Sequence, residues 1–422
     1  MKKIKIFAII HTEYTNTFDT LFYEAKKDDI FDWTFVIIPF KDERIEISLE
    51  NIEKVMKEKK YPYIKGYDQT TKTYLDIKQF APDITLLQTP YDQQRISYLY
   101  SSKYFSTFSR CYHVSYGSSL VDYDYPPYNE VLYQQDRLCT TLCESTEFCK
   151  ILNKYNIHPN VPIGYIKCDK YINYKDNPDF TFKKRDQYKQ IIAWKPRWIG
   201  TIGDSNLLTY LEFFITYCKK NPDTLLYFIL HDLLRNEVVF RRRIISPKKF
   251  DSIMQEIIEL PNIKIIGHDD FLDDVFNADI FIGDYCSTIL EFSLTGKPVI
   301  YTPCDIVLST YGKKIISGYY IVNNIDEMKK QINQLREKID PLKKIRKNNI
   351  YLISDTHPNQ SIAKYCLEYF KKLDYTVPIN IKRDDLKEEK QITKTKLSCV
   401  NKIRYKMWKH LGKKLQKKGI IQ

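Results

Sequence analysis

The sequence has no run of 18 apolar residues, so we expect no transmembrane helix. Its first apolar run, residues 4–10, is too short for a signal peptide, and no small-residue cleavage site follows it. We interpret this run as a buried strand and expect a cytoplasmic protein without an export signal. The ten cysteines lack paired metal-ligand spacing, since Cys139 and Cys143 lie four apart and the others are scattered. This pattern predicts reduced thiols.

Acidic residues are missing from the last 32 residues, 391–422, which hold ten Lys/Arg and so carry +10 of the formal net charge of +13. The rest of the chain is close to neutral, so a nucleic-acid partner is not expected. Apolar residues recur in the tail at helical spacing: Leu397, Val400, Ile403, Met407, Trp408, Leu411 and Leu415. The pattern predicts a basic amphipathic helix that lies on an anionic membrane surface. The alternative is a helix that docks on its own domain or stays partly disordered.

The 422 residues, 43% of them hydrophobic, are too many for one core and suit two α/β domains. Short apolar runs that predict buried parallel strands alternate with helical patterns. The predicted strands are 4–10, 33–38, 84–87, 110–117 (which ends in a loop), 190–194, 225–230, 263–266, 280–283 and 299–301. The predicted helices are 51–60, 73–80, 136–155, 206–220 (capped by Asp204 or Ser205) and 360–373.

Two consecutive alternations predict two Rossmann-like, doubly wound domains that face each other across a cleft. We expect an amino-terminal acceptor domain at 1–169, a polar linker at 170–188 and a nucleotide-donor domain at 189–350. A closing helix at 351–375 and the basic tail at 376–422 complete the chain.

The most informative segment is 277–301. A buried strand, 280–283, runs into Asp284-Tyr285-Cys286-Ser287-Thr288 and then into a helix that begins near Ser287 or Thr288 and that Gly296 ends. Hydroxyls and free amides at the carboxyl edge of such a sheet bind phosphates. The alternative is an ordinary βαβ unit with a Ser or Thr N-cap.

Several segments together resemble bacterial CDP-glycerol glycerophosphotransferases and related cell-surface polymer transferases of the GT-B fold. The resemblance spans roughly residues 4–373 and depends on the order of segments 82–92, 112–117, 164–169, 192–198, 207–214, 229–234, 279–298 and 355–361. It implies a GT-B transferase that uses no cofactor and no metal, because His, Arg, Lys and helix N-termini supply the positive charge. No Asp-x-Asp pattern follows a donor-binding strand, which agrees with this expectation.

The resemblance implies a donor site in the carboxyl half. Ser287 and Thr288 would bind the donor diphosphate, and Gly117 of the amino half is also assigned to donor binding. Asp284 would orient the loop of Ser287 and Thr288 rather than touch an anion. Glu291 would accept hydrogen bonds from ribose; the alternative is a solvated helix carboxylate. His231, at the end of a strand, would donate to phosphate or protonate the leaving group.

Arg197 stands where relatives commonly have His. Its planar fork suits phosphate, so we assign Arg197, together with Lys195, to stabilisation of the leaving diphosphate. The alternative is a surface arginine stacked on Trp198.

The sequence does not identify the general base that would activate the acceptor hydroxyl. Teichoic acid polymerases have a His-Gly pair where this chain has Tyr116-Gly117. His113 lies three residues earlier, and positions three apart in a strand face opposite ways, so His113 cannot simply replace that His. Either Tyr116 contacts the acceptor and another group is the base, or the chemistry differs from that of the polymerases. Asp92 and His11 are alternative bases.

These features together favour a transferase on the inner face of the cell membrane. It would move a polyol phosphate, such as glycerol phosphate, from a CDP-linked donor to a glycan or lipid-linked acceptor and release CMP. One alternative is a GT-B glycosyltransferase that uses a nucleotide sugar, because the fold serves both reactions. Another is a non-catalytic scaffold, since Tyr116 and Arg197 replace histidines of the family.

Overall fold

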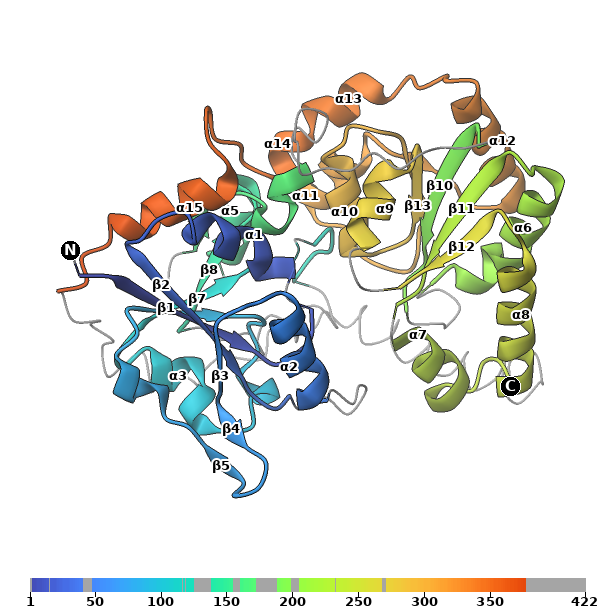
Figure 1. Ribbon diagram of the computed structural model, residues 1–422. Coiled ribbons are helices and arrows are strands. Elements are labelled where there is room, and N and C mark those ends of the chain that lie inside the picture. Colours follow the sequence, from blue (N-terminus) through green and yellow to red (C-terminus); the bar gives the residue numbers. More distant parts are fainter. Residues whose placement is uncertain are drawn as a thin grey trace, which may run out of the picture.

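The computed structural model describes residues 2–14, 16–40, 48–115, 117, 119–124, 138–154, 160–171, 188–198, 205–231, 233–267 and 271–376. Within these residues the chain forms two α/β lobes side by side (Figure 1). The predicted fold of two doubly wound domains is confirmed. The predicted tail helix lies outside the described residues, and so does most of the predicted linker.

The amino-terminal lobe contains a parallel sheet of seven strands in the order β3-β2-β1-β6-β7-β8-β9. The strands are β1 (Ile4–Ile10), β2 (Phe31–Ile37), β3 (Tyr63–Lys65), β6 (Ile84–Leu87), β7 (Arg110–Val114), β8 (Thr140–Cys143) and β9 (Val161–Pro162). In register, Ile6 of β1 lies between Trp33 and Ile84. A small antiparallel hairpin is made by β4 (Tyr67–Asp68) and β5 (Thr73–Tyr74).

The carboxyl-terminal lobe contains a parallel sheet of six strands in the order β12-β11-β10-β13-β14-β15. The strands are β10 (Gln190–Lys195), β11 (Thr224–Ile229), β12 (Ile263–Ile266), β13 (Ile280–Gly283), β14 (Val299–Tyr301) and β15 (Tyr320–Ile321). The order reverses between β10 and β13, where Ile192 pairs with Ile280. Open α/β sheets bind ligands beyond the carboxyl ends of the strands at this reversal.

Helices connect the strands, and seven of the fourteen α-helices in the described residues begin at a side chain that caps them. Ser145, for example, accepts a hydrogen bond from the amide of Phe148 at the start of α5. The helices are α1 (Asn16–Ala25), α2 (Leu49–Glu58), α3 (Ser102–Phe105), α5 (Thr146–Leu152), α6 (Leu207–Lys220), α7 (Leu233–Arg235), α8 (Pro247–Glu259), α9 (Phe271–Asn277), α10 (Ser287–Ser293), α11 (Thr310–Ile316), α12 (Ile325–Arg336), α13 (Lys343–Asn348), α14 (Ile350–Ile353) and α15 (Ile362–Lys371). The described residues also contain four 3₁₀ turns, η1 (Ile77–Phe80), η2 (Asp92–Gln94), η3 (Tyr98–Tyr100) and η4 (Ile166–Tyr171), and one π-helical turn, η6 (Asn236–Arg241). None of the helices in the described part of the chain is long and apolar enough to cross a membrane.

Both faces of each sheet are covered by apolar side chains. Along β1, Ile6 and Ile10 belong to one buried cluster and Phe7 and Ile9 to another. Successive residues of β10 divide in the same way between two clusters. This burial on both faces explains why the strands are continuous apolar runs rather than alternating ones.

Main-chain contacts hold the lobes together. Val121, in the loop after β7, forms an antiparallel bridge with Leu308, and the amide of Ser309 donates to the carbonyl of Leu120 at 3.0 Å. After α14 the chain returns to the amino-terminal lobe, where α15 packs beside α1 (Figure 1). Asp169 accepts hydrogen bonds from the first amides of α15, those of Ile362 and Ala363.

Two predicted helices are wrong. The region predicted as a helix over 136–155 contains strand β8 and the short helix α5, with Ser145 as the N-cap that separates them. The region predicted as a helix over 73–80 contains β5 and the 3₁₀ turn η1, which Asp76 caps. In both cases an internal cap begins a new element. Thr141, Leu142 and Cys143 are buried in β8, which pairs with β7.

The start of α6 is close to its prediction. Asn206 is the N-cap and makes no side-chain capping bond, whereas Ser205 accepts from the amide of Leu207 at 3.2 Å. Asp204 lies outside the described residues.

Candidate functional site

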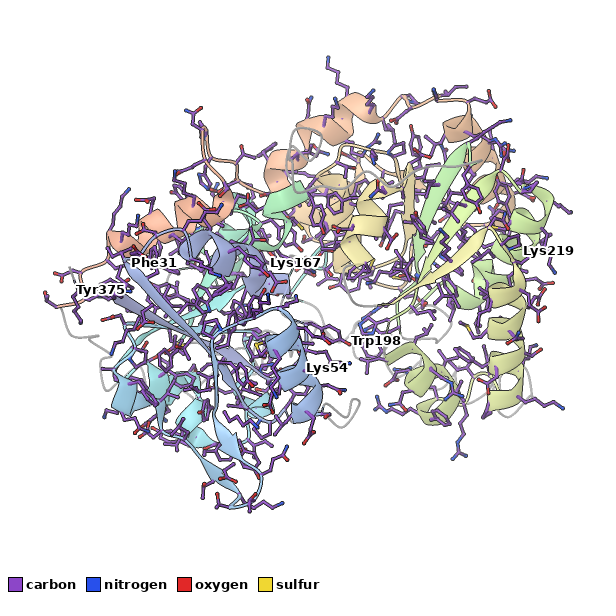
Figure 2. The ribbon with its side chains drawn as sticks, in the orientation of Figure 1. Phe31, Lys54, Lys167, Trp198, Lys219 and Tyr375 are labelled. Carbon is purple, nitrogen blue, oxygen red and sulfur yellow. The ribbon has the colours of Figure 1, made fainter. Side chains whose placement is uncertain are left out.

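A cavity of about 500 Å³ lies between the lobes, at the carboxyl edges of the two sheets, and we call it the interlobe cleft. Figure 2 shows Lys167 and Trp198, which both line it, where the two lobes face each other. The predicted residues that the structure brings to its wall are His113, Gly117, Lys195, Arg197, His231, Ser287 and Thr288. The cleft therefore gathers hydroxyls and cationic side chains from separate parts of the sequence.

The hydroxyl pair stands at the beginning of α10, immediately after β13. Ser287 is half-buried and Thr288 is buried. The N-cap residue is Cys286, with extended backbone, and its side chain makes no capping hydrogen bond. The alternative of a Ser or Thr N-cap is therefore wrong. The side chain of Cys286 accepts no hydrogen bond from the backbone amides of the first turn of α10. Gly296 ends this segment with a positive φ of 67°, as the sequence predicts.

Asp284 joins three segments of the carboxyl-terminal lobe. Its carboxylate accepts hydrogen bonds from the backbone amides of Arg197 at 2.7 Å and Asn206 at 3.0 Å. The side chain is fully buried, and burial raises the pKa of Asp284 to about 6, although both amide bonds oppose this shift. Asp284 thus fixes the loop after β10 and the start of α6 relative to the end of β13.

Two cationic side chains stand at the carboxyl end of β10, Lys195 as its last residue and Arg197 just beyond it. The ammonium of Lys195 lies 4.2 Å from the centre of the Phe271 ring, and the guanidinium of Arg197 lies 5.0 Å from the centre of the Tyr285 ring. Tyr285 thus provides an aromatic ring beside the Arg197 guanidinium. Both cations border the cleft beside Ser287 and Thr288. Cation–π contact orients such groups while they keep their charge.

His231 follows β11 at the same edge of the sheet. Its Nδ1 accepts a hydrogen bond from the backbone amide of Leu233 at 3.2 Å, so the neutral ring carries its proton on Nε2. The ring of Trp198 lies 5.9 Å away, centre to centre. A neutral His231 can therefore donate one hydrogen bond from Nε2.

The amino-terminal wall of the cleft is formed by the end of β7. His113 is buried, and burial, assisted by the charge of Arg95, lowers the pKa of this imidazole to about 3. A ring with so low a pKa is a weak proton acceptor at neutral pH. Tyr116 lies outside the described residues. Gly117 meets the other lobe, because a Cβ added there would lie 2.9 Å from Cβ of Ser287.

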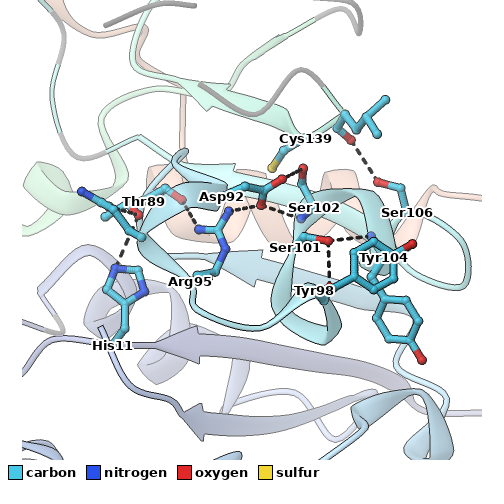
Figure 3. Close-up of polar contacts among 12 residues, drawn as sticks. His11, Thr89, Asp92, Arg95, Tyr98, Ser101, Ser102, Tyr104, Ser106 and Cys139 are labelled. Carbon is cyan, nitrogen blue, oxygen red and sulfur yellow. Dashed lines mark hydrogen bonds and ion pairs between the residues drawn. The ribbon is translucent and has the colours of Figure 1, made fainter. Parts of the chain in front are cut away.

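The two alternative bases have other surroundings (Figure 3). Asp92 binds the Arg95 guanidinium and accepts from the amide and hydroxyl of Ser102 at 2.7 and 2.8 Å. His11 is fully buried, stacks on Phe40 at 4.8 Å, and has its pKa lowered to about 3 by burial and by Arg95. Neither residue is among the described residues that line the cleft. Their contacts are those of side chains that hold loops together.

Glu291 is fully buried in α10, so the alternative of a solvated carboxylate is wrong. Its Oε1 accepts from the Lys167 ammonium at 2.7 Å and from the Tyr165 hydroxyl at 3.0 Å, and both donors belong to the amino-terminal lobe. Burial is the largest single influence and lowers the pKa of Lys167, but the negative charges around the ammonium, Glu291 first, and the hydrogen bond to Glu291 together outweigh it and raise this pKa. The pair connects the lobes directly behind the cleft, and Lys167 rather than Glu291 lines the cleft.

Sequence reasoning missed three residues at this site. Lys167 and Ser115 lie inside segments that carried the family resemblance, 164–169 and 112–117, but nothing in their spacing singled them out. Glu144 follows β8, which was predicted as helix. Its Oε1 accepts a hydrogen bond from the Ser115 hydroxyl at 2.6 Å. Correct assignment of β8 as a strand would have placed Glu144 at the carboxyl edge of the sheet.

No protein-family model matches the sequence, and comparison with curated protein sequences finds no match. Solved structures do match over most of the chain. The wall teichoic acid polymerase TagF, soaked with CDPG, superposes with a TM-score of 0.57 at 10% identity, over 91% of this chain and 89% of that chain. The MnaA–UDP structure from S. aureus has a TM-score of 0.56 at 11% identity, over 88% and 96% of the two chains.

UDP-GlcNAc 2-epimerase from Neisseria meningitidis, bound to UDP-GlcNAc, has a TM-score of 0.55 at 15% identity, over 87% of this chain and all of that chain. At such low identities these likenesses establish the fold. The chain has the GT-B fold, as the sequence predicts.

Proposed function

We propose that this chain transfers a polyol phosphate, such as glycerol phosphate, from a CDP-activated donor to a glycan or lipid-linked acceptor. The observation that supports the proposal most is the arrangement at the reversal of the carboxyl-terminal sheet. There, Lys195 and Arg197 at the end of β10 and Ser287 and Thr288 after β13 line one cleft. Two cations and two hydroxyls at a switch point suit a diphosphate.

The proposed reaction uses these residues in distinct roles. The acceptor oxygen attacks the β-phosphorus of the donor, the bond from that phosphorus to the bridging oxygen breaks, and CMP leaves with the electron pair. Arg197 and Lys195 stabilise the negative charge that grows on the leaving phosphate. His231 donates from Nε2 to a phosphate oxygen, and Ser287 and Thr288 hold the diphosphate in position.

Glu291 has a different proposed role from the ribose binding that the resemblance implies. Because its Oε1 is occupied by Lys167 and Tyr165, we propose that Glu291 positions Lys167 at the cleft wall. We propose that Asp284 orients the site, as expected, because its carboxylate accepts a hydrogen bond from the backbone amide of Arg197.

A glycosyltransferase that uses a nucleotide sugar is the second candidate. The observation that favours it is the likeness to structures that contain UDP or UDP-GlcNAc, which equals the likeness to TagF in extent. The charged wall of the cleft serves either donor, since both present a diphosphate.

A thermal-shift panel separates the candidates. We expect CDP-glycerol or CDP-ribitol to raise the melting temperature, because a ligand that binds only the folded state stabilises it. Stabilisation by a UDP-sugar or CMP-sugar alone would favour the glycosyltransferase. The absence of any shift at millimolar nucleotide would contradict both and support the scaffold.

We further propose that the enzyme works at the cytoplasmic face of the membrane. The support is the charge of residues 391–422, ten Lys/Arg with no acidic residue, interleaved with apolar residues at helical spacing. Each cation near an anionic surface contributes about 1 kcal/mol, partly screened by salt.

A further inference from the structure

Glu144 is a buried carboxylate one strand away from the interlobe cleft. It follows β8, its side chain is 1% exposed, and the amide of Asp355 donates to its backbone carbonyl at 2.9 Å. Within the described residues, Oε2 has no hydrogen-bond partner. A buried carboxylate with one unsatisfied oxygen costs stability, so its presence calls for a function.

Ser115 connects this carboxylate to the cleft. It follows the neighbouring strand β7, lines the cleft wall, and is 6% exposed. Its hydroxyl lies 2.6 Å from Oε1 of Glu144. Gly117, two residues further along, packs against Ser287 of the other lobe. The Ser115 hydroxyl thus stands between the cleft, near the proposed phosphate site, and a buried proton acceptor.

We propose that Ser115 and Glu144 form the proton relay that activates the acceptor hydroxyl. This inference rests on the proposed function. As the acceptor oxygen bonds to the β-phosphorus, its proton passes to Oγ of Ser115. The Ser115 proton passes at the same time to Oε1 of Glu144. The bond from phosphorus to the bridging oxygen breaks, and the nucleotide monophosphate leaves with the electron pair. Ser115 touches the acceptor, whereas Glu144 acts through Ser115.

The proton affinity of Glu144 suits this role. Burial raises its pKa to about 7, and the charge of Glu291 adds to the shift, while the Ser115 hydrogen bond and Lys167 oppose it. The titratable groups around Glu144 on the elements packed against it are Glu291, Lys167, Tyr165, Tyr123, Cys143, Cys149, Cys168 and Asp355. An acceptor whose pKa is near the working pH transfers protons efficiently. His113, with a pKa of about 3, does not meet this condition.

The test is the pH profile of CMP release from CDP-glycerol, with water or glycerol as acceptor. For the wild type we expect kcat/KM to rise with pH and to level off above about pH 7. Glu144→Gln keeps the shape of the side chain, and its amide oxygen can still accept the hydrogen bond from the Ser115 hydroxyl. It cannot take up the proton from Ser115 during the reaction. We expect a loss of roughly 100-fold at pH 8, the usual contribution of a general base. The difference in kcat/KM between wild type and variant should shrink towards pH 5.5, and the variant's kcat/KM should no longer rise near pH 7.

Ser115→Ala interrupts the relay with Glu144 in place and should show the same loss at pH 8. The matched control is Glu147→Gln on α5, which removes the charge of a half-buried glutamate paired with the exposed Lys150 and should leave the profile unchanged. CDP-glycerol should still raise the melting temperature of both relay variants, which shows that they fold and bind donor.

If the wild type releases CMP and Glu144→Gln keeps both its rate and its rise near pH 7, the relay is wrong and the proposed function stands. A loss confined to Glu144→Gln, with Ser115→Ala at the wild-type rate, would also overturn the relay. If the wild type neither binds CDP-glycerol nor releases CMP, the proposed function itself has failed.

Discussion

Removing the charge of Glu291 should destabilise the protein strongly. Glu291→Gln leaves the Lys167 ammonium, whose side chain is 9% exposed, without the carboxylate that lies 2.7 Å away in the other lobe. Breaking a buried pair in this way costs about 3–5 kcal/mol. Because glutamine still accepts a hydrogen bond, we expect the lower end, about 3 kcal/mol. For a lobe of this size that corresponds to a fall of roughly 6–12 °C in melting temperature.

The assay is thermal unfolding with a matched control. Glu256→Gln removes the charge from an exposed pair with Lys219 and should change the free energy of unfolding by less than about 1 kcal/mol. Replacing both partners, as Lys167→Met with Glu291→Leu, should recover most of the loss, because no buried charge then remains. If Glu291→Gln lowers the free energy of unfolding no more than Glu256→Gln does, the buried pair of Lys167 and Glu291 does not stabilise the fold as argued.

Two further predictions concern acid stability and the tail. His11 and His113 are buried with pKa values lowered to about 3, so below pH 6.5 the unfolded state binds protons that the native state does not. Stability is therefore complete above pH 6.5 and falls as the pH drops towards 3; in urea titrations His11→Gln with His113→Gln should flatten this fall by roughly 1–3 kcal/mol per pH unit. A double variant with the wild-type slope would show that these rings are charged in the native state. Deletion of residues 391–422 should release the protein from anionic liposomes in a sedimentation assay and leave the melting temperature unchanged; a destabilised protein that stays bound would indicate that the tail docks internally.

Strands buried on both faces are continuous apolar runs, such as 280–283 and 190–194, and the sequence predicts nine of the thirteen sheet strands in the described residues. It misses the short strands β3, β9 and β15 at the sheet edges. It fails at β8, where Thr140-Thr141-Leu142-Cys143 is too short to be distinguished from the helix that follows. Pairing with β7, which forms only in the tertiary structure, makes it a strand.

The donor side of the site could be predicted for the same reason. Lys195, Arg197, His231, Ser287 and Thr288 each follow a recognisable strand of one sheet, and the carboxyl ends of parallel strands share one edge. The partners of Glu291 and Glu144 could not be predicted. Lys167 is 124 residues from Glu291, and Ser115 is 29 residues from Glu144. Such pairs depend on how loops and lobes pack, which no local pattern encodes.

The most direct test of the account is nucleotide binding to Ser287→Ala with Thr288→Ala, measured by calorimetry with the donor that stabilises the wild type most. Hydrogen bonds to a charged phosphate contribute about 1.5–3 kcal/mol each, so we predict affinity weaker by roughly 100-fold or more. The melting temperature without ligand should match that of the wild type. An unchanged dissociation constant would contradict the claim that a donor diphosphate binds at the beginning of α10.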